Sequence, residues 1–144
     1  MGIVKEGREI MSSFRFRKKT EYGLMMVTLL ARAGRNRIVS VRAMQELGLP
    51  RSFLVKIARD LIKAKLISAK EGRGGGYQLI VDPEKVNLKR VVEAMEGEVA
   101  TAGCLIHGAK KCPLEKACPH KGVMGKLTQQ LGEILANYRL VDLQ

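Results

Sequence analysis

The feature that most constrains the fold is a succession of three helical segments between residues 20 and 64. In the first segment, apolar residues recur three and four positions apart, and Thr20 is the expected N-cap. The second segment, over 41–47, is short and has Ser40 as its expected cap, after a brief extended stretch. The third opens at Pro50 or the residue that follows it. Helix, short helix, glycine-containing turn and helix are typical of a helix-turn-helix.

Two short β-type runs, over 66–69 and 77–80, follow the third helix and are separated by a glycine-rich, net-basic tip. This pattern predicts a β-hairpin in the position of a wing. The glycines are not followed by the Lys-Ser/Thr pair of a phosphate-binding loop, so nucleotide binding is not indicated. The expected fold is mainly α with a small β-hairpin wing: a winged helix-turn-helix with a long C-terminal helix.

The division of the chain follows from these segments. We expect a flexible N-terminal extension over 1–13 and a winged helix-turn-helix over 14–97. A cysteine-rich loop for a metal or cluster should follow over 98–120, and a dimerisation helix with its tail over 121–144.

The charge of the chain indicates a polyanionic partner. Its 26 Lys and Arg residues outnumber 14 acidic ones, which gives a formal net charge of +12. A basic composition also serves solubility alone. The third helix favours double-stranded DNA, because basic and hydroxyl residues lie opposite its apolar stripe. That stripe consists of Phe53, Leu54, Ile57, Ala58, Leu61 and Ile62. The expected DNA-binding residues are Pro50, Arg51, Ser52, Lys56 and Arg59 of this helix, with Lys70 and Arg73 of the wing.

The three cysteines of the chain, Cys104, Cys112 and Cys118, lie in one loop with the spacing Cys-x7-Cys-x5-Cys. Glycines and prolines in this loop oppose a helix. An odd number of thiols does not suit a disulfide framework, whereas gathered sulfur ligands suit zinc, copper(I) or an iron–sulfur cluster. The sequence therefore predicts a metal centre.

The final helix is expected from about residue 121 to 139, with apolar residues three and four positions apart. Such a heptad seam pairs helices, although packing on its own domain is the alternative. We expect a homodimer, because helix-turn-helix proteins usually bind paired half-sites. The expected interface residues are Met124, Leu127, Leu131, Ile134 and Tyr138.

Taken together, these segments resemble the winged-helix iron–sulfur transcription regulators of the IscR, NsrR and RirA type. The resemblance rests on residues 20–24, 49–54, 72–77 and 93–97 and on the three-cysteine loop, and it spans roughly residues 14–142. It implies a homodimeric DNA-binding transcription regulator, not an enzyme, whose DNA affinity is controlled by a cluster sensing iron, redox state or nitric oxide. The cluster that the resemblance implies would be 2Fe–2S or 4Fe–4S, and the first cysteine gap is similar to that of the RirA-like branch.

The resemblance also implies a fourth ligand beside the cysteines. In some members it is an acidic residue at the start of the first helix that reaches across the dimer, and Glu21 occupies that position. Other members use a His after the third Cys; His120 lies two residues on rather than three. His107 is the third candidate. The wing departs from the family pattern, because Glu71 stands where related regulators often carry Arg.

Two other classes stay open. One is a DNA-binding regulator with a structural zinc, in a Cys3His set, or with a thiol redox switch. The other is an iron–sulfur electron-transfer protein, which poorly explains a basic recognition-type helix. No catalytic Ser/His/Asp pattern occurs, and no apolar run reaches the length of a membrane span. Unpaired cysteines and an N-terminus without an apolar signal core point to the cytoplasm.

Overall fold

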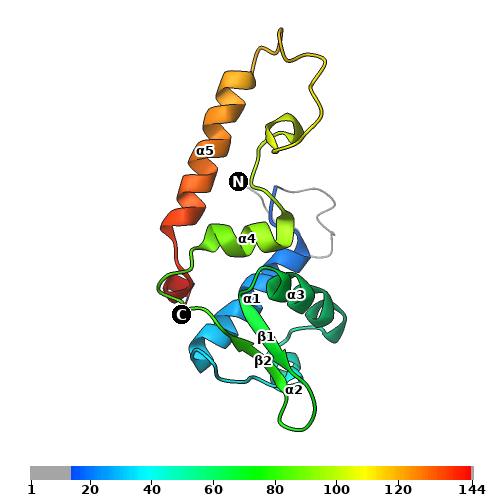
Figure 1. Ribbon diagram of the computed structural model, residues 1–144, viewed down its shortest axis with the longest axis vertical. Helices are drawn as coiled ribbons and strands as arrows, with labels where there is room; N and C mark the ends of the chain where they lie inside the picture. The colour runs from blue at the N-terminus through cyan, green and yellow to red at the C-terminus, as the bar shows by residue number, and fades with distance from the viewer. Residues whose placement is uncertain (1–13, 144) are drawn as a thin grey trace, which may run out of the picture.

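The computed structural model describes residues 14–143, so the expected flexible extension over 1–13 lies outside the described residues. The fold is mainly helical with one antiparallel hairpin, which confirms the predicted class (Figure 1). In chain order the elements are α1 (Lys18–Ala33), α2 (Val41–Glu46), α3 (Arg51–Lys63), β1 (Ile67–Lys70), β2 (Gly76–Leu79), α4 (Leu88–Glu96), the 3-10 helix η1 (Gly103–Leu105), α5 (Lys121–Asn137) and the 3-10 helix η2 (Leu140–Leu143).

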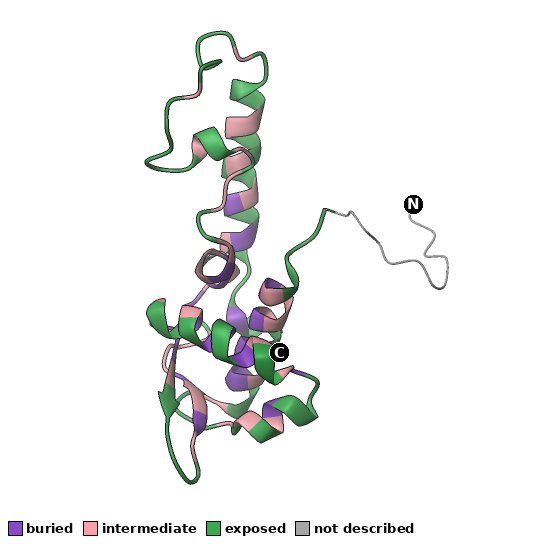
Figure 2. Cartoon of the chain, turned by 90° about the vertical axis from the view of Figure 1, so that its right-hand side faces the viewer, coloured by how far each residue is buried: buried purple, intermediate pink, exposed green. Residues whose placement is uncertain are grey.

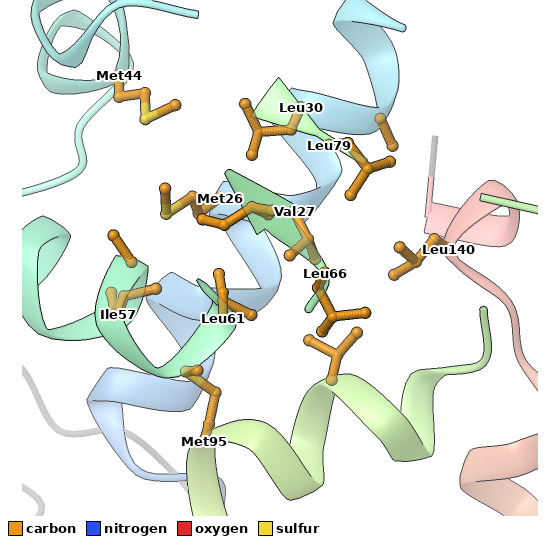
Figure 3. Packing of buried hydrophobic residues seen from close by; sticks show 14 of the residues in the cluster. Met26, Val27, Leu30, Met44, Ile57, Leu61, Leu66, Leu79, Met95 and Leu140 are labelled. Carbon is orange, nitrogen blue, oxygen red and sulfur yellow. The ribbon is translucent and has the colours of Figure 1, made fainter. Parts of the chain in front are cut away.

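The core forms where the apolar faces of α1, α3 and α4 meet the hairpin. Met26 and Leu30 of α1 and Ile57 and Leu61 of α3 are fully buried. Figure 3 shows these side chains beside Met95 of α4 and the strand residues, while η2 adds its own leucine from the end of the chain. Burying an aliphatic side chain of this size stabilises a fold by about 1.5–3 kcal/mol. This core therefore fixes α3 relative to α1 and α4.

Ile62 departs from the predicted apolar stripe of α3. It is 41% exposed, although Leu54, Ile57, Ala58 and Leu61 are buried. Ile62 lies one position beyond the buried leucine, and the 100° step of the helix carries it out of the contact with α1 and α4. The stripe is thus narrower than its sequence pattern indicates.

The structure confirms one of the two predicted N-caps and contradicts the other. The Ser40 hydroxyl accepts a hydrogen bond from the Ala43 amide at 3.1 Å, which confirms it as the cap of α2. Pro50 is the N-cap of α3. Thr20, by contrast, is not the cap of α1: that helix begins at Lys18 with Arg17 at the N-cap. Thr20 is fully buried in the first turn, where its hydroxyl has a tertiary partner.

The wing is held by a third piece of extended chain. β1 pairs with β2 in the register Ile67↔Leu79 to Lys70↔Gly76. Val39 forms an isolated bridge with Tyr77, with its amide 2.8 Å from the Tyr77 carbonyl and its carbonyl 3.0 Å from the Tyr77 amide. The extended segment before α2 therefore pairs with the outer edge of β2 through this single β-bridge.

α5 is anchored at its C-terminal end to the start of α4. The Leu88 amide donates to the Tyr138 carbonyl at 2.7 Å, and the Leu140 amide donates to the Val86 carbonyl at 3.0 Å. This pairing requires extended backbone at Tyr138, so α5 ends at Asn137 instead of about residue 139. Figures 1 and 2 show α5 projecting from the winged-helix part, with the cysteine loop at its far end and the wing tip at the opposite end of the molecule.

Candidate metal centre and nucleic-acid interface

The outward face of α3 carries the residues expected to bind DNA. Arg51, Ser52, Lys56 and Arg59 are exposed, while the opposite side of the helix is buried in the core. Pro50, at the N-cap, is half-buried. The helix thus presents one basic and hydroxyl surface of the kind that enters a major groove.

Val55 also lies on this outward face, where the sequence interpretation did not consider it. Its side chain is 55% exposed. The helical period could have placed Val55 on this face, because it follows Ser52 by three positions and precedes Arg59 by four. An exposed apolar group among basic ones is suited to contact the methyl group of thymine.

The wing tip presents Lys70 and Arg73 to solvent, and Glu71 is exposed between them. Two tip glycines, Gly72 and Gly74, have φ angles of 84° and 73°, in the left-handed region that other residues rarely adopt. Gly76 has a different requirement: a Cβ atom there would collide with the Val39 carbonyl. The glycines consequently do more than make the tip flexible, because Gly76 permits the backbone of Val39 to approach β2.

The three cysteines line a single cavity of about 140 Å³ in the loop between α4 and α5. Cys104 lies in η1 and is exposed, Cys112 and Cys118 are half-buried, and all three are free thiols. The start of the loop is fastened to α5, since the Thr101 hydroxyl donates to the Met124 carbonyl at 2.9 Å. Three sulfur donors in one cavity are suited to a soft metal centre.

A zinc ion and an iron–sulfur cluster place different demands on the geometry of their donors. Within residues 14–143, no three His, Cys, Asp or Glu side chains converge closely enough to surround one metal ion. A structural zinc ion requires four ligands within about 2.0–2.3 Å of a single point. In a cluster, the thiolates bind to different iron atoms and therefore stand further apart. The three thiols that share this cavity are sulfur donors of the kind that either centre uses.

None of the three candidates for the fourth ligand is among the described residues that line this cavity. Glu21, in the first turn of α1, has its carboxylate 3.1 Å from Lys18 Nζ. His120 is exposed at the N-cap of α5. His107 is turned toward Glu98, with its Nδ1 2.6 Å from one carboxylate oxygen and its amide 2.9 Å from the other. These hydrogen bonds hold the pKa of Glu98 below its ordinary value.

α4 lies between the cysteine loop and α3. At its C-terminal end, Glu96 accepts hydrogen bonds from the Arg17 amide at 3.2 Å and from the Thr20 hydroxyl. At its N-terminal end, the Arg90 guanidinium donates to the carbonyl of Ala64, the C-cap of α3, at 3.0 Å. One rigid helix thus contacts the start of α1 and the end of α3, immediately before the loop begins.

Met95, beside Glu96, completes this connection by packing where three helices meet. A Cβ atom at Gly23 of α1 would lie 2.7 Å from Met95 Sδ and 3.7 Å from Ile57 Cγ2 of α3. The glycine therefore permits the close approach of α4 to α1. A shift of α4 would move the packing partner of the recognition helix.

α5 exposes an apolar face that its own domain leaves uncovered. Leu127 and Ile134 are 43% and 55% exposed, and Tyr138, just beyond the helix, is 54% exposed. Met124 and Leu131 are half-buried, whereas Leu135 on the adjacent face is buried against the domain. The helix thus has one apolar side packed inward and a second side directed to solvent.

No helix within residues 14–143 has both the length and the apolar character that crossing a bilayer requires.

A basic helix-turn-helix surface, a wing and a fastened cysteine loop define a DNA-binding transcription regulator of the winged helix-turn-helix class. The family model Rrf2, described as "Iron-dependent Transcriptional regulator", matches residues 16–144. The chain belongs to this family. Its membership confirms the resemblance inferred from the motifs and the expectation of a regulator rather than an enzyme.

Individual relatives are also transcription regulators. The chain is 29% identical over 125 residues to the HTH-type transcriptional regulator NsrR of Shouchella clausii, covering 86% of this chain and 84% of the relative. It is 30% identical over 125 residues to the NsrR of Halalkalibacterium halodurans, covering 86% of each protein.

Two solved structures share the fold. CymR (YrzC), the global cysteine regulator of B. subtilis, matches with a TM-score of 0.70 and 20% identity over 91% of this chain and 96% of that structure. T. potens IscR matches with a TM-score of 0.67 and 23% identity over 91% of this chain and 86% of that structure. At these identities the likeness establishes the fold alone.

Proposed function

We propose that this transcription regulator is a homodimer whose affinity for DNA is set by an iron–sulfur cluster bound in the cysteine loop. Residues 14–97 would bind the operator, 98–120 would hold the cluster and 121–144 would form the dimer. The single observation that carries the proposal is the cavity lined by Cys104, Cys112 and Cys118. When bound, the cluster supplies an oxidisable, iron-dependent centre that responds to iron supply, redox state or nitric oxide.

The fourth ligand is proposed to come from outside the chain's own cavity. Glu21 is not among the residues that line the cavity of the three thiols within one protomer, which suits the interpretation that Glu21 of the partner subunit completes the site. A carboxylate is a harder ligand than a thiolate and makes such a centre easier to displace, as a sensor requires. His120 and His107 are the alternatives; for either, the loop would have to rearrange, and His107 would have to leave Glu98.

The DNA contacts are proposed for the outward face of α3 and for the wing. Arg51, Lys56 and Arg59 are suited to guanine edges and phosphates, and Ser52 to either. Lys70 and Arg73 would contact the backbone beside the recognition helix, with exposed Glu71 limiting how closely the wing approaches phosphate. Pro50 fixes the start of α3 without requiring an amide partner.

The coupling between loop and DNA is proposed to run through α4. Loop residues 98–120 reorganise when the thiols bind metal, and α4 ends immediately before them. Because Glu96 is fastened to α1 and Arg90 to the end of α3, a movement of α4 would change the orientation of the recognition helix. Ligand-free and ligand-bound loops would then differ in DNA affinity. The free thiols suit a reducing compartment, the cytoplasm.

The cluster is tested by anaerobic purification, followed by iron and acid-labile sulfide assays and an absorption spectrum. We expect a brown protein with equal iron and sulfide that becomes colourless in Cys112→Ala, while Ala117→Ser, at an exposed loop position outside the cavity wall, stays brown. The spectrum separates 2Fe–2S from 4Fe–4S. A colourless protein that carries zinc would replace the proposal with a zinc-stabilised regulator. A protein without metal, even after reconstitution with iron and sulfide, would leave a thiol switch.

A further inference from the structure

The cavity that contains the three cysteines is lined by lysines as well. Lys110, Lys111 and Lys121 line it, and the one acidic residue that residues 14–143 contribute to its wall is Glu115. We name these three lysines the lysine rim. Leu105 and Ala109 provide the apolar remainder of the wall. Thiols and ammonium groups thus share one small space.

The charges of this rim are not balanced. Glu115 is engaged by Lys121, whose Nζ lies 3.0 Å from the carboxylate. Among residues 14–143, no carboxylate lies within ion-pair distance of Lys110 or Lys111. Two ammonium groups of the cavity wall therefore have no fixed counter-charge in the part of the chain that the structure describes, and both residues are exposed.

A concave site lined by charge of one sign raises the local concentration of the opposite ion. The walls exclude part of the solvent that would screen this field, so the effect is larger than for lysines on a flat surface. Reactants that carry negative charge should consequently meet the cysteines more often than neutral reactants of the same size. Cations should meet them less often.

We propose that the cysteine cavity is an anion-selective reactive site, in which Lys110 and Lys111 recruit small anionic electrophiles and anionic ligands to Cys104, Cys112 and Cys118. This inference goes beyond the proposed function, because it says which chemical class of molecule reaches the thiols. It is a property of the metal-free chain. Its failure would leave the cluster proposal intact, and the converse also holds.

The test compares two alkylating reagents on reduced, metal-free, full-length protein under anaerobic conditions. Iodoacetate and iodoacetamide react in the same way: the cysteine thiolate forms an S–C bond, the C–I bond breaks and iodide leaves. They are alike in size, but iodoacetate is an anion and iodoacetamide is neutral. The ratio of their rates therefore isolates the charge of the reagent, because thiol exposure and the thiolate fraction affect both rates equally.

We expect this ratio to fall roughly three- to tenfold in the Lys110→Gln/Lys111→Gln double variant, at or below the lower end of the gains of about 10 to 10³ that electrostatic steering gives. The ratio should stay at its wild-type value in Lys110→Arg/Lys111→Arg, which keeps the charge. Lys126→Gln, on the exposed side of α5, is the matched control and should leave the ratio unchanged. Raising the salt concentration should lower the wild-type ratio toward that of the Gln double variant.

The proposal would be overturned by equal ratios in the wild type and the Gln double variant. An equal fall in Lys126→Gln would also overturn it, because the effect would then reflect overall net charge instead of the rim. Unfolding of a variant is recognised separately, since it would raise the iodoacetamide rate as well.

Discussion

The Thr20 hydroxyl donates a hydrogen bond to the Glu96 carboxylate, which joins two residues 76 positions apart in the chain. The same carboxylate accepts hydrogen bonds from the backbone amide and the guanidinium of Arg17. Glu96 therefore supplies from α4 the N-terminal acceptor that α1 lacks in its own sequence, and a negative charge at that end is favourable for a helix. The contact fastens α4 to α1 next to the cysteine loop.

The Glu96 contact should make the stability of the protein depend on pH. Partial burial raises the pKa of Glu96, but hydrogen bonds from Thr20 and Arg17 outweigh it and hold the pKa below its ordinary value of 4.5. A carboxylate with a depressed folded-state pKa stabilises the fold above its ordinary pKa, and this contribution is lost as the pH falls through the folded-state pKa. Glu96→Gln should lower the free energy of unfolding by about 1–2 kcal/mol at neutral pH.

Urea unfolding of both proteins at neutral pH and again well below pH 4.5 measures this difference. The difference in the free energy of unfolding between wild type and Glu96→Gln should be smaller at the acidic pH. Glu46→Gln is the control, because its exposed pair with Arg42 should contribute between about 0 and 1 kcal/mol. If Glu96→Gln loses the same free energy of unfolding at both pH values, the carboxylate charge does not stabilise α1.

The wing should tolerate a side chain at one glycine and not at another. Gly76→Ala places a Cβ against the Val39 carbonyl, so the Val39–Tyr77 bridge must open. We expect a loss of about 1–3 kcal/mol in the free energy of unfolding, together with weaker DNA binding. Gly74→Asn is the matched change in the same tip: its φ of 73° suits Asn, and a Cβ there meets no neighbour within 4 Å. Thermal unfolding of both variants compares them; equal losses would contradict the account.

The basic residues of α3 should differ from other surface lysines in the salt dependence of binding. Each phosphate contact contributes a slope of about −0.9 in log K against log salt concentration. If Lys56 binds a phosphate, Lys56→Gln should therefore reduce the magnitude of this slope by about one. If Lys56 reads a base, the same variant should weaken the binding free energy by about 1–3 kcal/mol and relax specificity at one base pair. Fluorescence anisotropy on a duplex selected from a random-sequence pool measures both. An effect no larger than that of Lys126→Gln would remove α3 from the interface.

The exposed face of α5 should determine the oligomeric state. Leu127→Glu/Ile134→Glu introduces charge where two apolar side chains are 43% and 55% exposed, and should convert a dimer to a monomer in sedimentation equilibrium. Lys126→Glu changes charge on the same helix outside that face and should leave the dimer intact. A wild-type protein that is itself monomeric at micromolar concentration would refute the proposed interface.

The sequence predicted the elements of this fold because they depend on local patterns. The Ser40 cap, the hairpin and the buried side of α3 all follow from residues within a few positions of one another. Thr20 was assigned wrongly, because its partner Glu96 is distant in sequence and no periodicity reports such a contact.

Two further differences have the same origin. α5 ends early because Tyr138 pairs with Leu88, which is a tertiary contact. The cysteines were recognised by type and spacing, whereas the lysine rim became apparent only when the loop was folded around a cavity. The sequence therefore predicted which residue types could carry the chemistry, but it did not predict the tertiary contacts between distant residues.

The most direct test of the central claim measures the affinity of one selected DNA duplex for the cluster-loaded protein and for the same preparation after the cluster is removed anaerobically. Because α4 contacts the end of α3 and ends where the loop begins, the proposed coupling should make the two dissociation constants differ by at least about fivefold, within the range typical of coupling between sites. Cys112→Ala should show the metal-free affinity whether or not iron and sulfide are supplied. Equal affinities of the loaded and metal-free protein would contradict cluster control of DNA binding.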